Sequence, residues 1–174
     1  MAAHSIDDSR LPLGLIGVLR LGLMGIIYMV MAEFDDLAVA SEGSRFGLPG
    51  VNIGVFCSTP AVGVARNVGR KRAMELLLTG EMVDAATALD WGLLNAVVPA
   101  DELDAAVARF TDVITSRSAA VIANGKRAFW TQIDQPLAAA YETAGRAMVA
   151  DLAGADAAEG IDAFLQKRRP VWRG

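Results

Sequence analysis

The sequence predicts an α/β fold in which a few short strands precede a helix-rich C-terminal half. Three observations predict it: short apolar runs bounded by turn residues after residue 35, apolar residues at helical spacing from residue 58 onward, and only helical patterns after residue 101. The chain has 174 residues, 53% of them hydrophobic, which suits one domain, or one domain with an appendage, and excludes a mostly disordered chain.

The first apolar stretch, residues 11–31, is uncharged except for Arg20 and is about as long as a bilayer span of roughly 20 residues. A transmembrane or signal-anchor segment is therefore one alternative. Against it, a charge at the centre of a span costs about 2.5–3.5 kcal/mol. In addition, His4, Asp7 and Asp8 stand where a secretory signal carries basic residues. We expect a buried, soluble segment rather than a membrane span.

Short strands are expected next. Residues 37–40 form an apolar run typical of a buried strand, and glycine and proline punctuate residues 41–49. Residues 51–56 are expected to form a second extended piece, and residues 93–98 are a β-rich stretch that ends at a proline.

Caps mark the expected helices. Ser58 or Thr59 is expected to cap the first, with Pro60 at its first helical position. The full set is residues 60–68, 70–78 ending at Gly80, 84–91 capped by Asp84, 101–114 capped by Asp101, 119–133, 136–151, and 157–167 capped by Asp156.

Composition excludes several classes of site. The single cysteine, Cys57, excludes an internal disulfide framework and a multi-cysteine zinc site. The single histidine, His4, excludes an internal His-dependent triad or a His-rich metal centre, so no metal site is expected. The net charge of −4 argues against a nucleic-acid partner.

Five ordered blocks carry a resemblance to a known superfamily. They are DLAVASE at 36–42, FGLPGVNIG at 46–54, LTGE at 78–81, AATALDWGLLNAVVP at 85–99 and EGIDAFLQKRRP at 159–170. On these blocks the chain is identified as a member of the crotonase, or enoyl-CoA hydratase/isomerase, superfamily. It most resembles the branch called enoyl-CoA hydratase domain-containing protein 3, over about residues 35–173 of the sequence.

The resemblance implies a spiral of β-β-α turns, truncated on its N-terminal side, followed by C-terminal helices that build trimers or hexamers. It divides the chain into an apolar segment outside the family at residues 1–34, a partial ββα core at 35–100, and a helical region at 101–174 that builds trimers and covers coenzyme A. The family's first half, which supplies one oxyanion-hole donor and much of the adenine pocket, is not expected here.

The resemblance also implies a chemistry, in which an oxyanion hole holds the carbonyl oxygen of an acyl-CoA thioester and two hydratase glutamates act as general acid and base. The glutamate positions match Val30 and Gly50, so no catalytic carboxylate is expected. Glu33 and Asp35 stand nearby, either as substitutes or as solvated loop residues. Tyr28 matches an oxyanion-hole position, where its side chain would crowd a thioester.

Substrate contact is implied at Phe164, Lys167, Gly50 and Cys57. The first two match positions that reach the coenzyme A of a neighbouring subunit, by packing on adenine and meeting phosphate; the alternative is a solvated basic helix end. Cys57 matches a loop that lines the acyl pocket, and the alternative is a buried apolar cysteine. No cofactor is expected, coenzyme A entering only as the substrate thioester.

The expected function is therefore that of an enoyl-CoA hydratase/isomerase family protein of acyl-CoA and fatty acid metabolism with little or no hydratase activity. The alternative is a non-catalytic crotonase-like subunit that oligomerises or binds coenzyme A weakly. The expected partners are an acyl-CoA and further copies of the chain in a homotrimer or hexamer, with no nucleic acid and no membrane. We expect a cytoplasmic location because no transit peptide is evident, with the mitochondrion as the alternative.

Overall fold

The computed structural model describes residues 18–21 and 36–173. The sequence-predicted positions outside the described residues are Tyr28, Val30, Glu33, Asp35 and most of residues 11–31. Among the helices that are described, none is both long enough and apolar enough to cross a bilayer.

The chain divides into two compact units. The strand unit is Ile16–Thr111, and the C-terminal unit is, in its described part, residues 112–173. Each unit is described by itself below.

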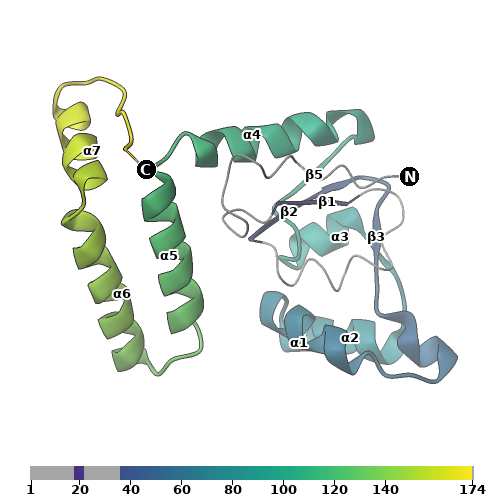
Figure 1. Ribbon diagram of the computed structural model, residues 1–174. Helices are drawn as coiled ribbons and strands as arrows, with labels where there is room; N and C mark the ends of the chain where they lie inside the picture. Colours follow the sequence, from purple (N-terminus) through teal and green to yellow (C-terminus); the bar gives the residue numbers. More distant parts are fainter. Residues whose placement is uncertain (1–17, 22–35, 174) are drawn as a thin grey trace. The chain divides into compact units, whose positions relative to one another are not determined.

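The strand unit contains a parallel three-stranded sheet in the order β1-β2-β5 and a short antiparallel pair, β3-β4 (Figure 1). The strands are β1 (Val18–Leu21), β2 (Leu37–Ser41), β3 (Arg45–Phe46), β4 (Val83–Asp84) and β5 (Ala96–Val98). The backbone of Val39 in β2 pairs with Arg20 on one side and with Ala96 on the other, so β2 is the central strand. Residues 38–40 of β2 are buried, as expected for a strand covered on both faces.

The helices of the strand unit begin and end close to the predicted caps. They are η2 (Pro49–Ile53), α1 (Ser58–Asn67), α2 (Arg70–Thr79), α3 (Ala85–Asp90), η3 (Ala100–Glu102) and α4 (Leu103–Thr115). Helix α2 ends at Gly80, whose left-handed φ of 63° suits glycine. Helix α3 is capped by Asp84, whose carboxylate accepts the Thr87 N–H at 2.8 Å. Both of these predictions are confirmed.

Two apolar clusters hold the strand unit together. The larger one joins α1, α2 and α3 to the strands and includes the fully buried side chains Phe46 and Leu76. The smaller one is formed by Val39, Leu103 and Val107, and it packs α4 on the sheet.

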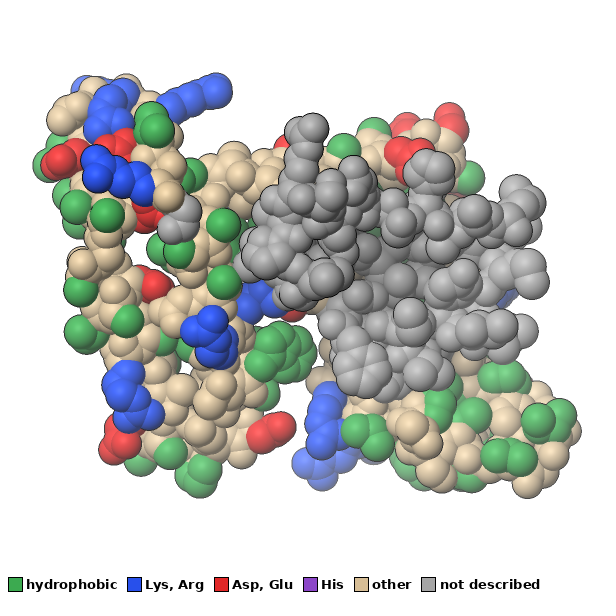
Figure 2. All heavy atoms as spheres, viewed as in Figure 1, with side chains coloured by type: hydrophobic (Ala, Val, Ile, Leu, Met, Phe, Trp, Pro, Cys, Tyr) green, Lys and Arg blue, Asp and Glu red, His purple; other side chains and the backbone are tan. Residues whose placement is uncertain are grey.

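The C-terminal unit consists mainly of α5 (Ala119–Gln132), α6 (Leu137–Leu152) and α7 (Ala155–Leu165). Helices α5 and α6 lie side by side (Figure 1), yet neither has a buried residue. Apolar side chains consequently line the surface of this unit (Figure 2). On α6 and α7 the large exposed ones are Leu137, Tyr141, Met148, Val149, Leu152, Ile161, Phe164 and Leu165.

The prediction that residues 51–56 form an extended piece is wrong. Pro49 begins the 3-10 helix η2, and Gly54, at a left-handed φ of 80°, ends it. A proline in the first turn and a glycine at the C-cap favour a helical turn over a strand. The alternating apolar pattern of this segment misled the prediction, because local turn chemistry determines its backbone.

Three cap predictions are also wrong. Helix α1 has Cys57 at its N-cap, and the Ser58 hydroxyl donates to the Phe56 carbonyl at 3.4 Å instead of capping. Asp101 lies within η3, ahead of α4. Asp156 lies in the first turn of α7, whose N-cap is Gly154, because its carboxylate is engaged by groups from elsewhere in the C-terminal unit.

Candidate functional site

The turn that follows β3 brings together two of the sequence-predicted site residues, Gly50 and Cys57. We call residues 49–57 the Gly50 turn. Its start and end are tied by hydrogen bonds: the Val55 N–H donates to the Gly50 carbonyl at 2.9 Å, and the Gly54 N–H donates to the Val51 carbonyl at 3.2 Å. The Gly50 turn is therefore a closed loop, stapled by its own backbone.

Gly50 lies against the far end of this closed loop. A Cβ atom built on Gly50 would overlap the Val55 carbonyl oxygen and would lie 2.6 Å from the Cys57 Sγ. Both Gly50 and Cys57 are half-buried, and the Cys57 side chain packs against the larger apolar cluster. The thiol thus occupies space beside the position that the resemblance assigns to a hydratase glutamate.

A second family block holds the Gly50 turn in place. The Asn52 side chain donates from Nδ2 to the Gly80 carbonyl at 3.3 Å. A Cβ on Gly80 would lie 2.8 Å from Asn52 Oδ1 and 2.9 Å from a Val51 methyl, so only glycine fits there. The blocks at residues 46–54 and 78–81 are thus parts of one corner of the fold.

Within the described residues, no group of three or more His, Cys, Asp or Glu side chains is arranged to hold a metal ion. The position Val30 lies outside the described residues, so the second hydratase position is represented by Gly50 alone.

Phe164 and Lys167 lie together at the end of α7 in the C-terminal unit. The Phe164 side chain is 82% exposed, and Lys167 is exposed just beyond the last helical turn. Lys167 has a φ of 53°, the one non-glycine residue at positive φ among those described. The Lys167 N–H donates to the Phe164 carbonyl at 3.2 Å, and the Arg168 N–H donates to the Ala163 carbonyl at 3.0 Å, which closes the helix end.

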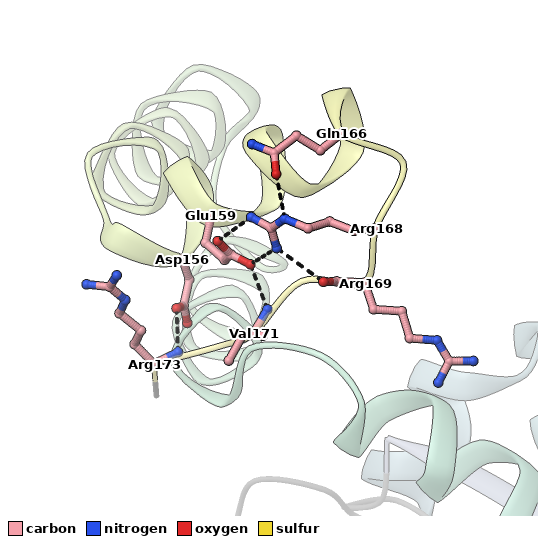
Figure 3. Close-up of polar contacts among 7 residues, drawn as sticks. All are labelled: Asp156, Glu159, Gln166, Arg168, Arg169, Val171 and Arg173. Atoms are coloured by element: carbon pink, nitrogen blue, oxygen red, sulfur yellow. Dashed lines mark hydrogen bonds and ion pairs between the residues drawn. The ribbon is translucent and has the colours of Figure 1, made fainter.

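The C-terminal tail folds back on α7 through Glu159 (Figure 3). The Arg168 guanidinium donates to both Glu159 carboxylate oxygens, at 2.6 and 3.0 Å, and the Val171 N–H donates to the same carboxylate at 2.7 Å. The hydrogen bond from Arg168, followed by that from Val171, lowers the pKa of Glu159 to about 2. The charge of Arg168 is therefore committed to Glu159, although Lys and Arg side chains gather around this end of α7 (Figure 2).

A buried carboxylate fixes the same tail one turn earlier in α7. Asp156 accepts a hydrogen bond from the Ser118 hydroxyl at 2.5 Å and another from the Arg173 N–H at 2.8 Å. Ser118 in turn caps α5 by accepting the Val121 N–H, and the Trp172 indole donates to the Ser116 carbonyl at 2.7 Å. We call Asp156, Glu159, Ser118 and the tail residues 168–173 the tail clasp.

The tail clasp predicts a pH dependence of stability. Because the pKa of Glu159 is about 2 in the folded chain and 4.5 is its ordinary value, the ionised clasp stabilises fully above pH 4.5 and loses this contribution as the pH falls toward about 2. We expect the thermal midpoint of the wild type to fall more steeply between about pH 5 and about pH 2 than that of Glu159→Gln. Parallel slopes for the two proteins would show that Glu159 does not hold the tail.

The described site residues form two groups, Gly50 with Cys57 in the strand unit and Phe164 with Lys167 in the C-terminal unit. Sequence reasoning missed Glu159 and the role of Asp156, since their partners lie 9 to 38 residues away along the chain. No local spacing signals such contacts.

Comparison with known families identifies the chain. The family model described as enoyl-CoA hydratase/isomerase matches residues 28–174. The chain belongs to the enoyl-CoA hydratase/isomerase family. The family and fold that the sequence blocks predicted are confirmed, including the spiral's crotonase relatives.

Relatives of the enoyl-CoA hydratase/isomerase family match most of this chain and about half of their own length. Enoyl-CoA hydratase domain-containing protein 3, mitochondrial, from mouse is 51% identical over 137 residues, 79% of this chain and 46% of the relative. The human protein of that name is 52% identical and is covered to 45%. This partial coverage fits the prediction that the resemblance lies in the C-terminal part of the family fold.

Solved structures of the family agree. A crystal structure of human enoyl-CoA hydratase domain-containing protein 3 superposes with a TM-score of 0.80 at 49% identity, covering 83% of this chain and 57% of that one. A crystal structure of an enoyl-CoA hydratase from Mycobacterium smegmatis gives a TM-score of 0.83 at 40% identity, covering 91% and 60%.

Proposed function

We propose that this chain binds an acyl-CoA thioester and has little or no hydratase activity. The observation that carries the proposal is Gly50, which follows Pro49 in the block where the family resemblance places a hydratase glutamate. Glycine has no side-chain proton to transfer, and general acid–base groups contribute about 10²–10⁴-fold to such reactions. Membership in the enoyl-CoA hydratase/isomerase family supports the acyl-CoA as the ligand.

Phe164 and Lys167 are the proposed coenzyme A contacts. An aromatic ring that is 82% exposed is available to stack on adenine, and a lysine ammonium suits a diphosphate. The left-handed backbone of Lys167 supports the same role, because a lysine there costs about 1 kcal/mol relative to a residue that tolerates positive φ. Gly50 and Cys57 are the proposed neighbours of the acyl portion.

Replacing Lys167 by glycine is expected to change stability and binding in opposite directions. Relief of the left-handed strain raises the thermal midpoint by about 1–3 °C, after the entropy that glycine adds to the unfolded chain. Loss of the ammonium weakens crotonyl-CoA binding by about tenfold in calorimetric titration, a typical effect of one charged hydrogen bond. Arg169→Ala, which removes an exposed cation two residues away, serves as the control. Unchanged affinity in Lys167→Gly would remove Lys167 from the ligand site.

The experiment that tests the function combines binding with turnover in one protein preparation. We expect calorimetry to detect crotonyl-CoA binding, and we expect the absorbance of the conjugated thioester to stay almost constant as hydration is monitored. Absence of binding would refute the acyl-CoA proposal, and rapid hydration would refute the inactive-hydratase proposal.

A second candidate function is favoured by the exposed apolar helices of the C-terminal unit. We propose that copies of the chain associate through this surface, as a non-catalytic crotonase-like subunit would, in a trimer or hexamer. Support comes from Tyr141, Met148 and Val149 on α6 and Leu165 on α7, which leave large apolar side chains in contact with water. Light scattering that gives the mass of a monomer at micromolar concentration would exclude it.

We propose the mitochondrion as the location, with fatty acid metabolism as the pathway class. The mouse and human relatives carry "mitochondrial" in their names, and this supports the alternative over the cytoplasm. Imaging of the tagged natural protein against a mitochondrial marker tests it, with a diffuse cytoplasmic signal as the contrary result.

A further inference from the structure

Gly50 is a glycine although its backbone does not require one. The glycines at positive φ among the described residues are Gly54, Gly80 and Gly92. Gly50 lies instead inside η2, in a conformation that any residue adopts. Conformational freedom therefore does not explain glycine at this position, and the surrounding space must.

The space beside Gly50 is already filled by atoms that cannot easily move away. A Cβ there would overlap the Val55 carbonyl oxygen and approach Cys57 Sγ to 2.6 Å, far inside ordinary van der Waals contact. The Val55 carbonyl is backbone, and its own residue is tied to Gly50 by the 2.9 Å hydrogen bond. Cys57 is held as well, because it is the N-cap of α1 and its carbonyl accepts the Ala61 N–H at 3.0 Å.

We propose that Gly50 is a specificity-determining residue of this site, because the closed Gly50 turn excludes every side chain at the position. The consequence rests on the proposed function: the site is committed to acyl-CoA chemistry in which residue 50 supplies no proton. Gly50 is thus a built-in part of the turn rather than a catalytic position that lost its glutamate. A single substitution does not restore a carboxylate there.

Gly50→Ala tests the exclusion without reference to any ligand. We expect it to lower the thermal midpoint of the 174-residue chain by about 3–10 °C, since an overpacked methyl group must displace backbone. Gly69→Ala is the matched control, because Gly69 also has an ordinary φ and no atom lies within 4 Å of its Cβ position. An equal midpoint for Gly50→Ala and the control would overturn the proposal.

Two more variants separate the thiol from the carbonyl. In the Cys57→Ala background, Gly50→Ala is expected to remain destabilising, with a smaller loss than in the wild type, because the Val55 carbonyl still blocks the methyl group. Full recovery in the double variant would show that Cys57 alone closes the site and would overturn the backbone part of the proposal.

Gly50→Glu tests the consequence for chemistry. We expect no gain in crotonyl-CoA hydration, alone or with Cys57→Ala. A stable Gly50→Glu protein with a wild-type midpoint, or one that hydrates crotonyl-CoA, would overturn the proposal. The midpoint of Gly50→Ala remains decisive where the glutamate variant does not fold. It also stays informative if the chain binds no acyl-CoA, in which case the proposed function alone fails.

Discussion

Phe46→Ala is expected to destabilise the strand unit by about 3–5 kcal/mol, which is usual for removing a buried phenylalanine ring. Phe46 is 1% exposed and is the largest fully buried side chain among those described. It belongs to β3, pairs with Val83, and precedes the Gly50 turn by only three residues. A cavity there loosens both the core and the turn that carries the candidate site.

Chemical denaturation followed by the fluorescence of Trp91 measures this effect, since Trp91 packs against the same cluster. The control is Phe56→Ala, an identical change at a ring that is 44% exposed, for which we expect a loss below about 1.5 kcal/mol. If both variants lose the same free energy of unfolding, Phe46 does not anchor the core as described.

Asp156→Ala is expected to destabilise the C-terminal unit by about 2–4 kcal/mol. The substitution leaves the Ser118 hydroxyl and the Arg173 N–H without their acceptor, and a donor left unsatisfied costs about 1–3 kcal/mol. Because the carboxylate is buried, water does not readily replace it. The tail clasp is expected to open with it, exposing the indole of Trp172.

The shift of the Trp172 emission spectrum and the unfolding midpoint report this opening. Asp162→Ala removes an exposed carboxylate from the same helix and should change stability by less than about 0.5 kcal/mol. An Asp156→Ala chain as stable as the Asp162→Ala chain would contradict the role given to the buried carboxylate.

Much of the fold follows from local sequence signals. Gly80 as a C-cap, Asp84 as an N-cap and the buried strand at residues 37–40 were all predicted, because each depends on neighbouring residues only. The prediction of an extended segment at residues 51–56 was wrong for the opposite reason. Its apolar alternation resembles a strand, but Pro49 and Gly54 impose a 3-10 turn.

The candidate site was predictable in its residue types and not in its packing. The absence of a carboxylate at Gly50 is legible in the sequence, whereas the blocking atoms come from Val55 and Cys57 through a turn that was not foreseen. The tail clasp was missed entirely. Asp156 has the appearance of an ordinary helix cap, and only the tertiary fold brings Ser118 and Arg173 to it.

The central claim is that this chain belongs to the hydratase/isomerase family and does not hydrate enoyl thioesters at the rate of an ordinary hydratase. The most direct measurement is the steady-state hydration of crotonyl-CoA, run beside an ordinary family hydratase in the same assay. With Gly50 in place of an acid, we expect kcat/KM at least about 10²-fold below that of the reference enzyme. A kcat/KM comparable to that of the reference enzyme would contradict the account.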